Sequence, residues 1–101
     1  MTVNARIDIP EKEIADFCRR HHIIKLSLFG SVLRSDFRTE SDVDVLVEFA
    51  EGKTPGFAFF RMQDELSNIL GRNVDLNTTQ GLSSYFREQV LQEAEVLYDA
   101  A

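Results

Sequence analysis

The segment DVDVLVEF, residues 42–49, most constrains what this chain can fold into. Alternate side chains of a β-strand point to opposite faces, so the three valines of this segment share one face, and Asp42 and Asp44 share the other. The aliphatic face suits burial in a core, whereas the carboxylates stand at the beginning of the acidic face. The pattern therefore predicts a strand that covers a hydrophobic core on one side and carries a polar site on the other.

The rest of the chain alternates between helical and extended patterns. Short apolar runs between turn residues predict strands, and apolar residues three and four apart predict helices. In chain order, we predict a helix over 9–22, a strand over 23–29, a short helix through VLRSDF with Ser31 as its N-cap, the strand over 42–49, a helix around 57–70 that ends at Gly71, a strand over 73–78, and a helix over 83–98 that opens with a serine cap. This order predicts an α/β fold whose helices pack mainly on one face of a small sheet.

Composition narrows the classes of function. A chain of 101 residues, with 44% hydrophobic and 28% charged residues, is expected to form one folded domain over residues 1–101. Its formal net charge of −6 argues against direct nucleic-acid binding, which needs a basic face. The single cysteine, Cys18, excludes an internal disulfide, and no signal or membrane segment is evident. We therefore expect a cytoplasmic protein that does not contact a membrane.

The two aspartates at the start of the 42–49 strand predict a metal site. Neighbouring carboxylates repel each other unless a cation lies between them. Mg²⁺ takes one or two carboxylates and completes its coordination shell with water and substrate phosphates. Asp75, between two apolar residues of the 73–78 strand, is the candidate third carboxylate. With Asp42, Asp44 and Asp75 together, one or two metal ions could serve phosphate chemistry.

Three residues that precede the 42–49 strand, Gly30, Ser31 and Arg34, form a candidate phosphate site. Gly30 allows a backbone to approach a phosphate closely, and the Ser31 hydroxyl, followed by a helix N-terminus, offers hydrogen-bond donors to an anion. Arg34, one turn later, could present its guanidinium to the same phosphate tail. A triphosphate held here would direct its α-phosphorus toward the carboxylates.

Simpler explanations exist for the same residues. The aspartate pair could cap the start of a solvated strand, and Asp75 could be an ordinary exposed strand residue. Ser31 could act only as a helix N-cap. Arg34 is as well explained by a surface ion pair with Asp36 or Glu40, because such pairs form readily.

The Gly30-Ser31 pair, ten intervening residues and then DVD resemble the signature of the DNA polymerase β-like nucleotidyltransferases. The chain is most similar to their minimal form, the MNT proteins found as antitoxins beside HEPN toxins in prokaryotes. The segment LSLFGSVLRSDFRTESDVDVLVEF, the NVDL strand and the LSSYFREQVLQEAEVLY tail all resemble MNT segments. The resemblance implies an α/β single-domain nucleotidyltransferase fold with a small mixed sheet.

The resemblance also implies an activity. It is Mg²⁺-dependent transfer of AMP from ATP to a tyrosine of a partner HEPN ribonuclease, which blocks the toxin. Gly30 and Ser31 would then hold the triphosphate, Asp42 and Asp44 would ligate metal, and Asp75 would assist the acceptor hydroxyl as base or as second-metal ligand.

Other functions fit the same residues less well. The fold could neutralise a toxin by binding alone, with a vestigial site. An aminoglycoside-type nucleotidyltransferase normally needs a second domain, and glycosyltransferases with an Asp-x-Asp site are larger. Three phenylalanines, Phe57, Phe59 and Phe60, lie near the start of the 57–70 helix. One narrow face of a helix cannot bury all three, so they could fill the core or contact a partner.

Overall fold

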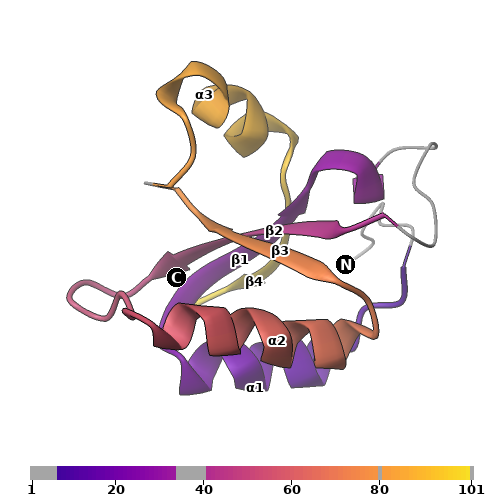
Figure 1. Ribbon diagram of the computed structural model, residues 1–101, viewed down its shortest axis with the longest axis vertical. Coiled ribbons are helices and arrows are strands. Elements are labelled where there is room, and N and C mark those ends of the chain that lie inside the picture. Colours follow the sequence, from indigo (N-terminus) through magenta and orange to yellow (C-terminus); the bar gives the residue numbers. More distant parts are fainter. Residues whose placement is uncertain (1–6, 34–40, 80, 101) are drawn as a thin grey trace.

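The computed structural model of the chain describes residues 7–33, 41–79 and 81–100 (Figure 1). Its elements, in chain order, are α1 (Glu11–Arg20), β1 (Ile23–Phe29), the 3₁₀ turn η1 (Gly30–Leu33), β2 (Val43–Phe49), α2 (Ala58–Leu70), β3 (Val74–Thr78), α3 (Ser84–Glu93) and β4 (Glu95–Asp99). No helix in these described ranges is long and apolar enough to cross a membrane.

The strands form one mixed sheet in the order β3-β2-β1-β4. Strand β1 pairs antiparallel with both β2 and β4, while β2 and β3 run parallel. Parallel neighbours need a crossover connection, and α2 supplies it between β2 and β3. The expectation of a small mixed sheet is therefore confirmed.

Two helices pack on one face of the sheet, and the third lies on the other side. Helices α1 and α2 lie side by side beneath the sheet in Figure 1, and α3 lies above it. The main core, between the sheet and α1 and α2, comprises Ile14, Phe17, Cys18, Ile23, Leu26, Leu28, Val32, Val43, Val45, Val47, Met62, Leu66, Val74 and Leu76. A smaller cluster of Leu46, Leu82 and Val90 joins α3 to the opposite face. The prediction of helices mainly on one face is confirmed.

Cys18 belongs to the main core. Its side chain is fully buried, and this burial raises the pKa of the thiol to about 12, against a smaller opposing effect of the Arg19 charge. The thiolate is the reactive form of cysteine, so this residue serves packing and not chemistry.

Local signals set most of the boundaries correctly. Helix α2 ends at Gly71, which has a left-handed backbone with φ of 67°. Ser83 caps α3, since its Oγ accepts a hydrogen bond from the Tyr85 backbone N–H at 3.2 Å. The short helix predicted through VLRSDF with Ser31 as its N-cap begins instead as a 3₁₀ turn at Gly30, so Ser31 lies inside the turn and the N-cap prediction is wrong. The rest of that predicted helix lies outside the described residues.

The prediction of one helix over 83–98 is wrong in its second half. Helix α3 ends at Glu93, and Ala94 has an extended backbone with φ of −62° and ψ of 138°. The next residues form β4, which pairs with β1. The apolar spacing fits a helix, but Val96 and Tyr98 are also strong strand formers. The backbone groups on the free side of β1 need hydrogen-bond partners, and this need favours a strand over a helix in residues 95–99.

A cluster of charged side chains joins α1 to α2. The carboxylate of Glu65 lies 2.5 Å from the Arg20 guanidinium and 2.9 Å from the His21 imidazole. Arg20 also pairs with Asp16 on its own helix at 3.2 Å. The hydrogen bond from Arg20 lowers the pKa of Glu65 below its usual value of 4.5, although partial burial opposes this shift.

We expect Glu65→Gln to lower the melting temperature at pH 7 by a few degrees, because it removes the ion pair between the two helices. The folded-state pKa of Glu65 lies below the unfolded value of 4.5, so this stabilisation is present above that pH and is lost as the pH falls through the folded-state pKa. Thermal unfolding between pH 7 and pH 3 should therefore show the two proteins converging. Glu88→Gln, on the exposed side of α3, is the control that should match wild type throughout. A difference that does not shrink as the pH falls below 4.5 would contradict this account.

Candidate active site

Two carboxylates lie side by side on neighbouring strands. Asp44 of β2 and Asp75 of β3 are opposite each other in the parallel ladder, in which strands are about 4.8 Å apart. The preceding residues Val43 and Val74 are buried in the main core. By the alternation of a strand, both aspartates therefore point to the other face of the sheet, the face that carries α3.

Asp42 stands immediately before β2 and is exposed. The N–H of Val43 donates to the carbonyl of Asn73 at 2.9 Å, so the chain here is already held beside the start of β3. Among the residues that the structure describes, no three Asp, Glu, His or Cys side chains are gathered into a group that could hold a metal ion. The structure thus brings Asp44 and Asp75 together and places Asp42 just ahead of them.

Gly30 leaves the space that the Asp44 side chain occupies. It follows the β1 residue Phe29, which is opposite Asp44 in the antiparallel ladder. A Cβ at position 30 would overlap the Asp44 Oδ2 and lie 3.2 Å from its Cγ. Gly30 also has φ of 76°, in the left-handed region that L side chains rarely adopt. Both the backbone and the neighbouring carboxylate therefore require glycine here.

The other predicted phosphate-binding residues are placed only in part. Ser31 lies in the η1 turn and is half-buried, next to Val32, which is anchored in the main core. The turn therefore fixes Ser31 one residue beyond the glycine that contacts Asp44. Arg34 lies outside the described residues.

Helix α3 lies on the side of the sheet that carries the carboxylates and joins it through a small apolar cluster. Leu46, two residues after Asp44 on β2, packs with Leu82 and Val90, and Phe29 joins this cluster. Asp75 is exposed and Asp44 is half-buried. A ligand can therefore reach Asp75 from solvent while one side of the site is bounded by apolar side chains.

Asn77, a polar residue that was not among the predicted site residues, lies next to the carboxylate pair. The Asn77 side-chain amide donates to the carbonyl of Asp75 at 3.0 Å, on the same strand. Its only signal in the sequence is its position two residues after Asp75, which places both on one face. This hydrogen bond stabilises the backbone of β3 at the residue that carries the carboxylate.

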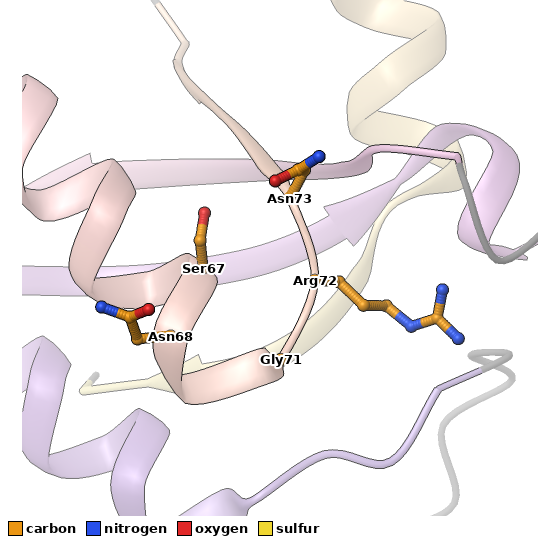
Figure 2. A pocket seen from close by; sticks show the side chains of 5 residues that line it. All are labelled: Ser67, Asn68, Gly71, Arg72 and Asn73. Atoms are coloured by element: carbon orange, nitrogen blue, oxygen red, sulfur yellow. The ribbon is translucent and has the colours of Figure 1, made fainter.

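A separate hollow of about 630 Å³ lies where α2 ends and β3 begins (Figure 2). It is lined by Ser67, Asn68, Gly71, Arg72 and Asn73. None of Asp42, Asp44 and Asp75 lines it, although Asn73 stands two residues before Asp75 and its carbonyl accepts a hydrogen bond from the N–H of Val43.

The donor chemistry of the carboxylate pair fits a hard divalent cation. Like charges directly opposite each other on adjacent strands destabilise a sheet, and a cation between them removes that cost. Mg²⁺ binds oxygen ligands and needs only one or two protein carboxylates when substrate phosphates and waters complete its shell. Asp44 and Asp75, with Asp42 close in sequence, therefore fit Mg²⁺ in the presence of a triphosphate.

Comparison with known families identifies the family of the chain. Residues 12–101 match the family described as polymerase beta, nucleotidyltransferase. The chain belongs to this nucleotidyltransferase family. The resemblance seen in Gly30, Ser31, Asp42 and Asp44 is thereby confirmed at the level of the family, while the roles of individual residues remain predictions.

Relatives of this nucleotidyltransferase carry names that agree with the family. A "Putative protein adenylyltransferase" of Methanocaldococcus jannaschii is 33% identical over 84 residues, which cover 83% of this chain and 89% of the relative. The protein adenylyltransferase MntA of Thermococcus cleftensis is 35% identical over 75 residues, covering 73% of this chain and 74% of the relative.

Solved structures share the fold of this nucleotidyltransferase. One described as "putative minimal nucleotidyltransferase" is 39% identical, with a TM-score of 0.71 over 84% of this chain and 86% of that chain. A toxin-antitoxin structure with AMP-PNP has a TM-score of 0.74 at 24% identity, over 90% of this chain and 74% of that chain. A tri-AMPylated Shewanella oneidensis HEPN toxin in complex with MNT antitoxin has a TM-score of 0.65 at 24% identity, over 88% and 69%.

We expect Gly30→Ala to destabilise the nucleotidyltransferase more than Gly71→Ala. Both glycines have positive φ, 76° and 67°, so either alanine incurs a left-handed cost of about 1–2 kcal/mol. Only at Gly30 does the new Cβ also collide with Asp44, since nothing lies within 4 Å of the corresponding position at Gly71. Denaturant unfolding should show a further loss of about 1 kcal/mol or more for Gly30→Ala. Equal losses of stability in the two variants would mean that the Asp44 side chain does not need a glycine at position 30.

Proposed function

We propose that this protein is a Mg²⁺-dependent protein adenylyltransferase that transfers AMP from ATP to a tyrosine hydroxyl of a cognate HEPN ribonuclease toxin and thereby acts as its antitoxin. The observation that carries the proposal is the pairing of Asp44 with Asp75, beside a glycine that the Asp44 side chain requires. Family membership supports nucleotidyl transfer. Relatives named protein adenylyltransferases, and the complex of MNT antitoxin with an AMPylated HEPN toxin, support transfer of AMP to a protein and a HEPN partner.

The proposed roles follow the order of the residues around the site. Gly30 and Ser31, with Arg34, bind the triphosphate of ATP. Asp42 and Asp44 hold Mg²⁺, which neutralises phosphate charge when bound. Asp75, the more exposed carboxylate of the facing pair, serves the acceptor as base or as a ligand to a second metal ion.

The proposed transfer forms one bond to phosphorus and breaks another, and this chain supplies the base. The acceptor oxygen forms a bond to the α-phosphorus of ATP, the bond from that phosphorus to the bridging oxygen breaks, and pyrophosphate leaves. The Asp75 carboxylate accepts the hydroxyl proton in its role as general base. Its position on the solvent-accessible face allows an acceptor side chain to approach without passing through the core.

Exposed aromatic residues support a protein partner. Phe57 and Phe60, at the start of α2, are 91% and 67% exposed. Phe59 instead packs against the main core, with its ring centroid 6.5 Å from that of Phe49. One of the three phenylalanines therefore belongs to the core and two lie on the surface. The exposed pair also suits the alternative function, in which the fold neutralises a toxin by binding alone.

We expect Asp42→Asn/Asp44→Asn to abolish nucleotide transfer, because it removes both proposed metal-holding carboxylates. The assay is intact mass spectrometry of the HEPN protein that co-purifies with the chain, after incubation with Mg²⁺ and each of the four nucleoside triphosphates. A mass gain of AMP with ATP, absent in the variant, is the expected result.

Asp64→Asn is the matched control for this assay, because Asp64 is an exposed carboxylate of α2 and lies outside the candidate site. It should transfer AMP at the wild-type rate. A stable complex that gains no mass with any nucleotide, and a toxin still neutralised by the double variant, would favour binding alone.

A second experiment isolates the metal. We expect Asp75→Asn to bind Mg²⁺ with a non-hydrolysable ATP analogue more weakly than wild type, because it removes one of the proposed carboxylate ligands. Mg²⁺ with a non-hydrolysable ATP analogue should stabilise wild type more than this variant. The proposed metal site is wrong if the stabilisation is the same in wild type, in Asp75→Asn and in Asp42→Asn/Asp44→Asn.

A further inference from the structure

The backbone of β3 is held from both sides at Asp75. Strand β2 pairs with its inner side. On the outer side, the N–H of Val74 donates to the Ser67 hydroxyl at 3.1 Å, and the N–H of Leu76 donates to the Gln63 side-chain carbonyl at 2.9 Å. These two amides flank Asp75 in the sequence. Two side chains of α2 therefore fix the strand immediately before and immediately after the carboxylate.

The two acceptors, Gln63 and Ser67, form one unit, here called the α2–β3 clamp. They are four residues apart on α2 and so lie on the same side of the helix. The Ser67 hydroxyl donates to the Gln63 backbone carbonyl at 2.9 Å while it accepts from Val74. A hydroxyl that donates becomes a better acceptor, so the two hydrogen bonds reinforce each other. Figure 2 shows the Ser67 side chain directed from α2 toward the beginning of β3.

The position of β3 in the sheet explains why such a clamp is needed. β3 stands at one end of the strand order and has a strand neighbour on one side only. Every second backbone amide of an edge strand points away from the sheet and must find another partner. A displacement of about 1 Å in a group that handles a proton can cost on the order of 100-fold in rate.

We infer that Gln63 and Ser67 are positioning residues that hold the Asp75 carboxylate level with Asp44. The inference rests on the proposed function, because it assigns the clamp to the carboxylate that serves the acceptor. Gln63 and Ser67 act only through the backbone of β3, on the face opposite to the reacting groups. Loss of the clamp is therefore expected to slow transfer and to leave nucleotide binding at Gly30 and Ser31 intact.

The test compares Gln63→Met/Ser67→Ala, which removes both acceptors at similar volume, with Ser67→Thr, which keeps the hydroxyl. Glu65→Gln is the control for general loss of α2 stability, because Glu65 binds α1 and not β3. AMP transfer to the co-purified HEPN protein gives kcat and the KM for ATP. We expect the double variant to lose about 10- to 100-fold in kcat with KM for ATP within about 2-fold of wild type. Ser67→Thr and Glu65→Gln should retain wild-type kcat.

Hydrogen exchange at the amides of Val74 and Leu76 gives a second readout, independent of activity. Both amides should exchange faster in Gln63→Met/Ser67→Ala and at the wild-type rate in Ser67→Thr. Unchanged exchange, unchanged kcat, or equal changes in kcat and KM would each overturn the inference. A wild-type chain that transfers no AMP overturns the proposed function and the inference with it, whereas an active wild type matched by the double variant overturns the inference alone.

Discussion

Burial of one side of β2 is the constraint on which the candidate site depends. Its valines fill the main core, and a slip of one residue would bring them to the α3 face and drive Asp44 into an apolar interior. This penalty holds β2 in a single register against β1 on one side and β3 on the other. Gly30 at the end of β1 and Asp75 on β3 therefore meet Asp44 from opposite sides. The arrangement of the polar groups follows from the packing of apolar groups on the face they do not occupy.

Local patterns in the sequence were sufficient for most elements because each pattern agrees with its tertiary environment. The strand over 23–29 has the predicted bounds, and Gly71 and Ser83 mark helix boundaries through their own backbone and side-chain chemistry. β4 was predicted as part of a helix because the spacing of its apolar residues also fits a helix. Its assignment depends on the unpaired side of β1, about 70 residues earlier in the chain. A local pattern contains no information about that need.

The candidate site was predictable as a set of residue types but not as an arrangement. Spacing and resemblance selected Gly30, Asp44 and Asp75, yet only the register of β2 with β3 shows that the two carboxylates face each other. Gly30 also has a structural reason that was not predicted. A side chain there would displace Asp44 before any phosphate approached. Gln63 and Ser67 were not predicted, because they act through backbone hydrogen bonds that ordinary polar residues on a helix can make.

The occupied outer edge of β3 also limits how an acceptor can be recognised. Many proteins bind an extended peptide by adding it to a sheet as a further strand, which requires outward N–H groups that are available. At Val74 and Leu76 those groups are already bonded to α2. A substrate segment thus cannot align itself along the sheet next to Asp75. Under the proposed function, the acceptor would then approach Asp75 over the face that carries α3, where side-chain contacts between two protein surfaces, and not strand pairing, would select it.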